Sequence, residues 1–447
     1  MTRVIITAIG SSGDVHPLLG IGAALAARGH EVVFCSHAPF EAAARRQGFA
    51  FVPIGTAGEY AAAMANPALW HPRTSFRTLW AVIAPTLQPH FQTLVSMIDD
   101  DTMMVGTLWA FSARLVQELY RVPLVSVQVS PSTLLSTHAP PTHPRLTIPR
   151  GLPLGLKRAL LYVIERQVLD KVCGPALNTL RAQLRLDPVT RIFGQWLHST
   201  DGVLCLFPEW FAQPQPDWPT PHRSSGFPLF NETGDAQSDP QLDTFLATGE
   251  RPVVFTAGST LIDHGRYEEA VRGALQESGL RGILLTPQAP ASAPESADPH
   301  GPMPTVLLKR RYVPMRTLLP RCRALVHHGG IGTAALAYAA GIAQVVTPFA
   351  HDQFDNAARV VASGCGVRLD GPLQARTLAR ALKQVLGDPA IATQCGRVQD
   401  HIAAAPDGCE AAAQFIEGFM RRGARVPWGR ADAAVTRTAM VVTGHGA

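Results

Sequence analysis

Two histidines followed by a cluster of glycines form the part of the sequence that points most directly to chemistry. An apolar run ends at His327 and His328, three glycines follow within the next four residues, and a helical pattern then begins. Glycine lets the backbone turn sharply and approach a ligand closely. The start of a helix offers unpaired N–H groups and about half a positive charge, which suits a diphosphate. The sequence therefore predicts an anion site, with a tight turn that binds nothing as the alternative; its residues are His327, His328, Gly329, Gly330, Ile331, Gly332 and Thr333.

A carboxylate and an amide follow the next predicted strand. Asp352 and Gln353 stand side by side, and such a pair offers acceptors and donors to neighbouring sugar hydroxyls. Charge-assisted bonds of this kind discriminate strongly between hydroxyl configurations. A helix N-cap is the alternative role for Asp352. Ser259 and Thr260, which end another predicted strand of the same half, are candidates to add hydroxyl donors at the diphosphate.

A second carboxylate lies near the start of the chain. Gly13 and Asp14 follow a short β-rich run, in a loop before a helix that we expect to begin near Pro17. Ligands collect at the carboxyl ends of the strands in open α/β sheets. A carboxylate there can accept a proton from an attacking hydroxyl, so Asp14 is the candidate general base. Helix capping is the alternative for Asp14, and His16 is the weaker candidate for the base.

Other common sites are not expected. The loop from Gly10 to Asp14 lacks the spacing G-x-G-x-x-G, and the strand that ends at Cys35 has no ribose-binding acid after it, which argues against an NAD-dependent enzyme. The seven cysteines are dispersed, without a Cys-x-x-Cys pair or a Cys/His cluster at zinc spacing. We therefore expect neither a disulfide framework nor a bound metal. The basic residues are scattered, so no nucleic-acid partner is expected.

The elements that must position these residues follow from the hydrophobic pattern. With 447 residues, 46% of them hydrophobic and 16% charged, the chain is typical of a globular protein of two or three domains. Short β-rich runs separated by helical stretches recur in both halves, which predicts an α/β protein with two doubly wound parallel sheets. The expected strands are Val4–Ile9, Glu31–Cys35, Met103–Val105, Val122–Val127 and Gly202–Leu206, then Pro252–Phe255, Gly282–Leu285, Thr305–Leu308, Ala324–His327 and Ala343–Thr347.

The domain boundaries and the compartment are also expectations from the sequence. We expect a first domain over residues 1–230, a Pro- and Gly-rich linker over about 208–250, a second domain over 251–405, and a loose tail over 426–447. The chain opens directly on a predicted strand and contains no run of 18 uncharged apolar residues. A signal peptide and a membrane span are therefore not expected, and the expected compartment is a reducing cytoplasm.

Two of these motifs resemble those of a known family. The segment from His327 to Thr333, together with Pro348, Asp352 and Gln353, resembles the donor-binding signature of the family-1 glycosyltransferases, whose members include plant, macrolide and sterol transferases. The segment Gly10–Pro17 resembles the acceptor-side loop of the bacterial and sterol members. Two matching motifs, one in each half and in the right order, are more specific than either alone.

The resemblance is stronger to one branch of the family, the rhamnosyltransferases of rhamnolipid biosynthesis. It extends over about residues 3–420 and is carried further by the segments Leu69–Phe76, Gln128–Ser136 and His351–Ala357. It implies a GT-B fold, in which two Rossmann-like domains face one another across a cleft. The first domain would bind the acceptor, the second would bind the nucleotide sugar, and a helix over 406–425 would return to the first domain.

The resemblance also implies a role for each site residue. Asp14 stands where the family places its general base, with Gly13 and His16 beside it. His328 or His327, with the turn from Gly329 to Thr333, would hold the pyrophosphate, and Asp352 with Gln353 would hold the sugar hydroxyls. Tyr312 matches an aromatic residue that stacks on the nucleobase, with the Val313 backbone beside it. Tyr312 replaces the tryptophan of the plant enzymes, and Ile331-Gly332 replaces a Trp-Asn pair, which is compatible with thymidine in place of uridine.

The implied reaction is transfer of L-rhamnose from dTDP-L-rhamnose, with inversion, to the hydroxyl of a 3-(3-hydroxyalkanoyloxy)alkanoate, which gives a mono-rhamnolipid. No cofactor or metal is implied. The implied partners are the nucleotide sugar, the lipidic acceptor and the acyltransferase that makes it. The apolar runs in residues 128–172 would line an acyl groove, contact the inner face of the cytoplasmic membrane, or form ordinary core helices. The alternatives are transfer to a sterol, macrolide or other lipophilic aglycone, a sugar-nucleotide epimerase of the same fold, and a non-catalytic nucleotide-sugar-binding protein.

Overall fold

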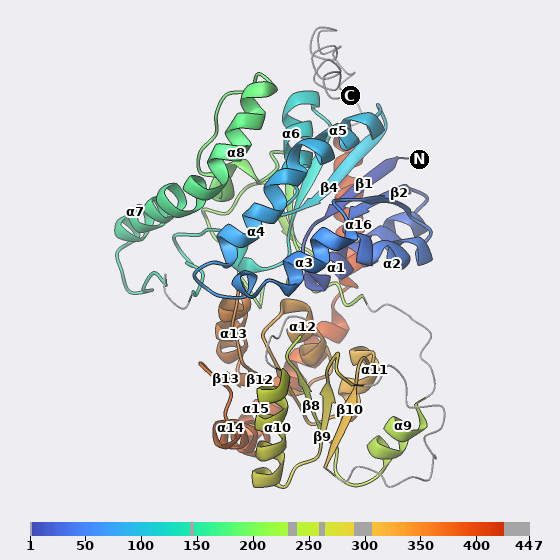
Figure 1. Cartoon of the computed structure of the whole chain (residues 1–447), viewed down its shortest axis with the longest axis vertical. Coiled ribbons are helices and arrows are strands. Elements are labelled where there is room, and N and C mark those ends of the chain that lie inside the picture. The colour runs from blue at the N-terminus through green and yellow to red at the C-terminus, as the bar shows by residue number, and fades with distance from the viewer. Residues whose placement is uncertain (1, 144–146, 231–238, 259–263, 290–305, 424–447) are drawn as a thin grey trace.

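The computed structural model describes residues 2–143, 147–230, 239–258, 264–289 and 306–423. Two parallel β-sheets flanked by helices form its two halves, one above the other (Figure 1). Both have the doubly wound arrangement in which strand order runs outward in two directions from a central strand. The predicted α/β fold with two Rossmann-like domains is confirmed.

The N-terminal sheet has seven parallel strands in the order β3-β2-β1-β4-β5-β6-β7. They are β1 Arg3–Ala8, β2 Glu31–Ser36, β3 Ala50–Pro53, β4 Thr102–Thr107, β5 Leu124–Gln128, β6 Gly202–Cys205 and β7 His222–Ser224. The helices around it are α1 Ser12–Ala27, α2 Glu41–Arg46, α3 Ala57–Ala65, α4 Ser75–Ile83, α5 Leu87–Met97, α6 Phe111–Tyr120, α7 Leu154–Ile164 and α8 Asp170–Gln183, with short helical turns η1 Ala38–Phe40 and η2 Pro67–Leu69. The strand order reverses between β1 and β4, so the loop from β1 to α1 lies at the switch point where ligands bind in such sheets.

The C-terminal sheet has six parallel strands in the order β10-β9-β8-β11-β12-β13. They are β8 Val253–Thr256, β9 Gly282–Leu285, β10 Leu307–Arg310, β11 Ala324–His327, β12 Ala343–Val346 and β13 Gly366–Arg368. Its helices are α9 Pro240–Ala247, α10 His264–Ser278, α11 Met315–Leu318, α12 Ile331–Ala339, α13 Gln353–Ala362, α14 Ala375–Gly387 and α15 Pro389–Ala404. The switch point lies between β8 and β11, where β11 ends at His327 and His328 follows directly.

Three features differ from the sequence expectations. The short strands β3, β7 and β13 were not predicted, because β7 and β13 have only three residues and β3 ends in a proline, which is uncommon within strands. Helix α1 begins at Ser12, not near Pro17, because Ser11 and Asp14 already cap the helix a full turn earlier; Pro17 lies inside the helix. The stretch 208–250, expected to be a linker, contains β7 and α9, and β7 pairs with β6. The expected strand residue Thr305 and the expected tail lie outside the described residues.

The last described helix, α16 (Gly408–Gly423), belongs to the N-terminal half although it follows the C-terminal domain in sequence. It packs against α1 and β6 and is the red helix in the upper half of Figure 1. Its Ala412, Ala413 and Ile416 are fully buried in the hydrophobic core that contains β1. Arg28 on the N-terminal domain also pairs with two glutamates of α16, at 2.8 and 3.1 Å. The chain therefore crosses between the domains twice.

The two crossings touch one another. A Cβ added to Gly408, at the start of α16, would lie 2.4 Å from the backbone oxygen of Phe227, which follows β7. Only glycine permits this approach. Beside the contact, Trp210 and Phe227 pack on Tyr338 of α12 with ring centroids 5.2 and 6.2 Å apart. The junction between the domains is therefore a compact aromatic cluster. None of the described helices is long and apolar enough to cross a membrane.

The buried face of α16 generates a stability prediction. Ile416→Ala removes a fully buried side chain from the N-terminal core, so we expect it to lower the free energy of unfolding of that domain by about 2–5 kcal/mol. Gln414→Ala, on the exposed face of the same helix, should change it by less than about 0.5 kcal/mol. Urea denaturation monitored by circular dichroism measures both. Equal midpoints for the two variants would mean that α16 contributes no core to the N-terminal domain.

Candidate active site

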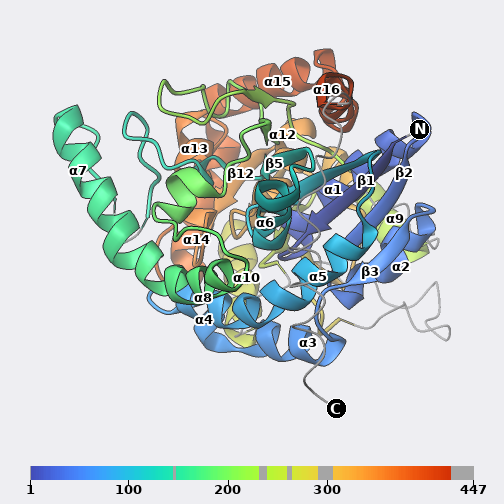
Figure 2. The same ribbon diagram turned by 90° about the horizontal axis from the view of Figure 1, so that it is seen from above.

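The loops that carry the predicted site residues lie at the edges where the two domains face one another (Figures 1 and 2). Helix α13 bonds directly to the N-terminal domain. The Ser130 hydroxyl donates to Asn356 Oδ1 at 3.2 Å, and the Thr142 N–H donates to Asp355 Oδ1 at 2.8 Å. The Arg359 guanidinium donates to the Phe211 carbonyl at 3.0 Å. The start of α13, which carries Asp352 and Gln353, is thus held against the N-terminal domain.

The Asp14 carboxylate is fixed at the first turn of α1. Its Oδ2 accepts hydrogen bonds from the N–H of Ser11 at 2.8 Å and from the Ser11 hydroxyl at 3.0 Å. The carboxyl folds back over Gly10, where an added Cβ would lie 2.4 Å from Oδ2 and where φ is +141°. Burial raises the pKa of Asp14, and the Ser11 bonds partly oppose this. Asp14 is therefore neither an N-cap of a helix near Pro17 nor an ordinary exposed carboxylate.

His327 is part of the framework of the glycine turn. Its ring is fully buried; Nε2 is 3.0 Å from Gln344 Oε1, and Nδ1 accepts the Gly329 N–H at 3.2 Å. These partners fix a neutral ring with its proton on Nε2, and burial lowers its pKa to about 3. Both ring nitrogens are occupied within the protein. Of the two histidines that the sequence left open, His327 is thus committed to shaping the turn.

His328 lies beside the start of α12 with an unsatisfied nitrogen. Its ring is packed between two glycines: an added Cβ would lie 2.7 Å from Cε1 at Gly258 and 2.6 Å from Nε2 at Gly330. Nδ1 is shielded from solvent and has no hydrogen-bond partner among the described residues. Burial lowers the pKa of His328 to about 4, so the ring is neutral near pH 7. It offers a ligand a hydrogen bond without a full charge.

The glycine-rich loop after β11 leaves open space beside the first N–H groups of α12. Gly329 has a φ of +97°, and an added Cβ there would lie 3.0 Å from the Gln353 backbone oxygen, so the turn packs directly on α13. Gly330 is the N-cap and has no side-chain cap bond, and an added Cβ at Gly332 would meet nothing within 4 Å. Open space beside uncapped helical N–H groups fits an anion. Ile331 is buried beneath this turn, and Thr333 is half-buried in it.

The Asp352 carboxylate bonds to another side chain. Asp352 occupies the N-cap position of α13 but makes no side-chain cap bond; its Oδ2 accepts from Asn356 Nδ2 at 2.8 Å. The same Asn356 amide donates to the Gly329 carbonyl at 3.0 Å, which ties the two donor-side loops together. Burial, and secondly the nearby charge of Asp14, raise the pKa of Asp352 to about 6. Two carboxylates from opposite domains are thus close enough to repel.

The Gln353 side chain fixes the loop that precedes it. Its Oε1 accepts the N–H groups of Phe349 and Ala350, both at 3.0 Å. The amide oxygen is therefore committed to the loop, and a sugar would meet the amide NH₂ group.

The remaining predicted residues are more scattered. Tyr312 is 64% exposed after β10, and Val313 beside it is buried against Leu318. Ser259 and Thr260 lie outside the described residues. Gly13 is exposed on the outer side of the β1–α1 turn.

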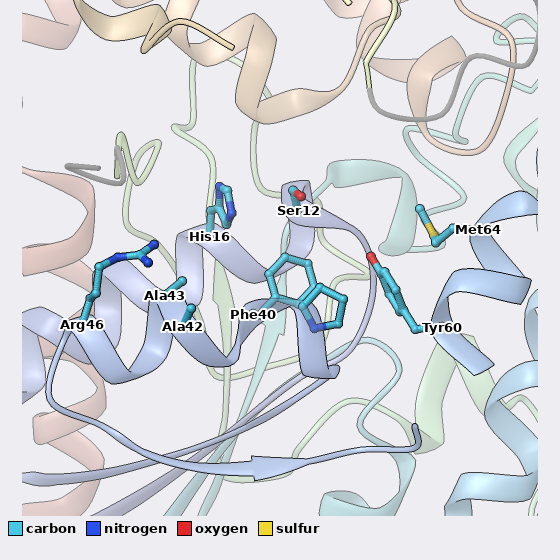
Figure 3. A pocket seen from close by; sticks show the side chains of 9 residues that line it. Ser12, His16, Phe40, Ala42, Ala43, Arg46, Tyr60 and Met64 are labelled. Atoms are coloured by element: carbon cyan, nitrogen blue, oxygen red, sulfur yellow. The ribbon is translucent and has the colours of Figure 1, made fainter. Parts of the chain in front are cut away.

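A cavity of about 410 Å³ opens beside α1 on the N-terminal domain (Figure 3). His16 points into it from α1 and meets Phe40 edge-on, with ring centroids 6.1 Å apart. Tyr60 closes one side of the cavity. Burial and the charge of Asp14 raise the pKa of the Tyr60 hydroxyl to about 12, so this hydroxyl lies near the Asp14 carboxylate. The cavity wall is mostly apolar and aromatic, with a few polar groups; its residues are Ser12, His16, Pro39, Phe40, Ala42, Ala43, Arg46, Tyr60 and Met64.

The sequence analysis missed several residues that shape this site. Asn356 bridges the donor-side loops, and its spacing of four residues from Asp352 on a helix was a usable signal. Ser130 and Tyr60 come from segments without a chemical motif. Among the described residues, no group of three or more His, Cys, Asp and Glu side chains is placed to hold a metal ion.

Comparison with known proteins adds independent information. The description "Glycosyltransferase family 28 N-terminal domain" matches residues 4–139, and "Erythromycin biosynthesis protein CIII-like, C-terminal domain" matches residues 295–417. Glycosyltransferase GtfC of Amycolatopsis orientalis is 30% identical over 386 residues, 83% of this chain and 87% of that protein. O-mycaminosyltylonolide 6-deoxyallosyltransferase of Streptomyces fradiae is 28% identical over 427 residues, 93% of this chain and 97% of that protein.

A solved structure shares the fold. Spinosyn rhamnosyltransferase SpnG complexed with thymidine diphosphate superimposes with a TM-score of 0.60 at 21% identity, over 93% of this chain and 100% of that chain. The match to GtfC covers most of both proteins, and the two domain matches lie in the same order as the two Rossmann-like domains. The chain therefore belongs to the family-1 GT-B glycosyltransferases, with an N-terminal domain of glycosyltransferase family 28 and a C-terminal domain of the erythromycin CIII type.

Proposed function

We propose that this glycosyltransferase moves L-rhamnose from dTDP-L-rhamnose to the hydroxyl of a 3-(3-hydroxyalkanoyloxy)alkanoate and forms a mono-rhamnolipid. One arrangement carries the site assignment. Hydrogen bonds fix the Asp14 carboxylate on the N-terminal domain, and Asp352 bonds to Asn356, which is itself hydrogen-bonded to that domain; the charge of Asp14 also helps to raise the pKa of Asp352. A proton acceptor and a sugar-binding carboxylate facing one another across a cleft are what glycosyl transfer to a hydroxyl requires.

The proposed mechanism is a single displacement with inversion. Asp14 accepts the proton of the acceptor hydroxyl as its oxygen bonds to C1 of the sugar, while the bond from C1 to the diphosphate oxygen breaks and dTDP leaves. The charge that develops on the diphosphate is stabilised by the first N–H groups of α12 and by a hydrogen bond from His328. Since burial keeps His328 neutral, the helix terminus supplies most of the positive potential.

The donor assignment rests on the C-terminal domain. Asp352 and the Gln353 amide would bind ring hydroxyls, and Tyr312 with Val313 would border the base. A rhamnosyltransferase of the same fold binds thymidine diphosphate, and a relative transfers another 6-deoxy sugar, which supports a dTDP-6-deoxyhexose donor. The cavity beside Asp14 supports a lipophilic acceptor, and a macrolide or other aglycone is the second candidate because the Streptomyces fradiae relative acts on one.

The lipid character of the acceptor is supported by helix α7. Its outward face exposes Leu156, Leu160 and Val163, at 47%, 39% and 53% exposure, although such side chains are usually covered. The carboxylates of this stretch, Glu165 and Asp170, are buried, and the exposed charges around it are basic: Arg150, Arg158 and Lys171. We propose that this face rests on an anionic membrane surface, where an acyltransferase would release the acceptor.

The base generates the first functional prediction. Asp14→Asn keeps the size of the side chain but removes the proton acceptor, so we expect kcat to fall at least about 10²-fold. The Kd for dTDP should not change, because the diphosphate binds on the other domain. Stopped assays with mass detection measure kcat, and calorimetry measures the Kd for dTDP. Wild-type kcat in the purified variant would assign the base to His16 instead.

The same pair of carboxylates predicts the pH profile. Asp14 must be ionised to act as a base, and burial raises its pKa, so kcat/KM should be lost as the pH falls. Burial and the charge of Asp14 raise the pKa of Asp352 to about 6, so the acidic limb belongs to the interacting pair and not to Asp14 alone. In Asp14→Asn one negative charge is gone, which lowers the pKa of Asp352, and the limb of the residual activity should move to lower pH. An unmoved limb would contradict the coupling.

The sugar site predicts the effect of Asp352→Ala. Loss of a charge-assisted bond to a ring hydroxyl should cost about 2–4 kcal/mol in kcat/KM for dTDP-rhamnose, with the Kd for dTDP unchanged. Wild type should prefer dTDP-rhamnose to dTDP-glucose by at least about 10²-fold, because apolar packing against C6 rejects an extra hydroxyl by about that factor and the ring hydroxyls of the two sugars also differ in configuration. If Asp352→Ala equals wild type, the carboxylate only ties loops together. If glucose is preferred, the rhamnosyl assignment is wrong.

The exposed face of α7 predicts vesicle binding. Wild type should co-sediment with vesicles of anionic phospholipid more strongly than with neutral ones. The double variant Leu156→Glu, Leu160→Glu should lose this binding while its activity on dispersed acceptor is kept, since both side chains are exposed and lie outside the cleft loops. Equal sedimentation of the variant and wild type would refute the membrane role of α7.

A further inference from the structure

A segment of the N-terminal domain reaches the loop that carries Asp352 and Gln353. Leu69 and Trp70, at 4% and 9% exposure, form a small apolar cluster with fully buried Ala350 of the C-terminal domain, and Phe349 packs against it. The Trp70 indole meets the His351 ring edge-on at 5.5 Å, with an interplanar angle of 86°. These contacts lie immediately before the residues that we assign to the sugar.

His351 has an unusual backbone conformation. Its φ is +51°, in the left-handed region that residues other than glycine rarely adopt without support. The support comes from the other domain, because the His351 ring lies beside the Leu69 backbone and packs edge-on against Trp70. We call Leu69, Trp70 and His351 the aromatic latch. Since Asp352 is the next residue, the latch fixes the direction in which the Asp352 carboxylate enters the cleft.

The segment that carries Trp70 is also a wall of the cavity beside Asp14. Tyr60 and Met64 of α3 line that cavity (Figure 3). The Met64 carbonyl accepts the Trp70 indole N–H at 3.1 Å, and Met64 packs against the apolar cluster. Helix α3 itself buries none of its residues. An element with so few buried contacts is held loosely, so a ligand that fills the cavity adds contacts that it otherwise lacks.

We propose that Trp70 is a positioning residue that couples the two substrate sites. It holds His351, and through it Asp352, in place for the sugar, and an acceptor in the cavity strengthens that hold through Met64. This inference rests on the proposed function, in which Asp352 binds the sugar and the cavity takes the acceptor. Its consequence is that acceptor binding raises the affinity for the sugar part of the donor and leaves the affinity for the nucleotide part unchanged.

The test measures the Kd of dTDP and of dTDP-rhamnose by calorimetry, in an Asp14→Asn background that slows turnover. The Kd of dTDP divided by the Kd of dTDP-rhamnose reports how much the sugar adds to the affinity for the donor. Trp70→Ala should reduce that ratio by up to about tenfold, the upper range of an aromatic pair, with the Kd of dTDP unchanged. Trp70→Phe should restore most of the ratio. His351→Gly keeps the left-handed backbone accessible but removes the ring, and should behave as Trp70→Ala does.

Two controls separate the possible failures. Trp109→Ala loses a similar edge-on ring contact, to Phe193 at 5.5 Å, inside the N-terminal domain, and should leave the ratio unchanged. Asp352→Ala should itself lose the sugar contribution. If it does not, the sugar lies elsewhere, and both the proposed sugar site and this inference fall. If Asp352→Ala loses it while Trp70→Ala and His351→Gly keep it, only the latch is refuted.

The coupling has its own readout. Adding a hydroxyalkanoyloxyalkanoate should raise the ratio of the two constants in the Asp14→Asn background, and this increase should vanish when Trp70→Ala is added. An increase of the same size in both proteins would show that the acceptor does not act through Trp70.

Discussion

In a parallel sheet every strand ends at the same edge, and every following helix begins there. The rest of this structure depends on that constraint. Each sheet gathers helix N-termini and short polar loops along one edge, and the two domains turn these edges toward one another. The N-terminal end of α12 and the carboxylate of Asp14 therefore lie on the edges that face one another, and each element keeps its regular path. Chemistry is confined to the loops because the strands behind them are almost entirely buried.

Burial then sets the charges at this edge. It keeps His327 and His328 neutral, whereas it pushes Asp14 and Asp352 toward protonation. In the function that we propose, attraction for the diphosphate would thus come from backbone dipoles that do not titrate, and the sensitivity of activity to pH would be concentrated in the carboxylates. The same low polarity makes the hydrogen bonds of Ser11 and Asn356 important, because a buried carboxylate without donors would be far more costly.

Much of this was predictable from the sequence, and the failures have identifiable causes. Runs rich in β-branched residues, such as Val4–Ile9, predicted the strands. Glycines directly after a strand predicted the turn at His328. The strands β7 and β13 have three residues each, and β3 ends in a proline, so none of the three shows a strand pattern. The separate positions of His327 and His328 depend on Gln344, which lies on the neighbouring strand and carries no motif. The approach of Asp14 to Asp352, and of Trp70 to His351, depends on how two domains dock, which no local pattern encodes.

The contact between Gly408 and Phe227 has a mechanical consequence. Two covalent connections that touch at one point act as a single pivot, in contrast to two separated tethers, which would prevent rotation. Displacement about a pivot grows with distance from it, and α13 lies well to one side of α16 in both views (Figures 1 and 2). A small rocking of the domains about this pivot would therefore be largest near α13, and the hydrogen bonds from Ser130 and Thr142 to that helix oppose it. Helix α13 begins beside Asp352, which we propose binds the sugar, so the part of the molecule most affected by rotation is also the part that must be placed most accurately.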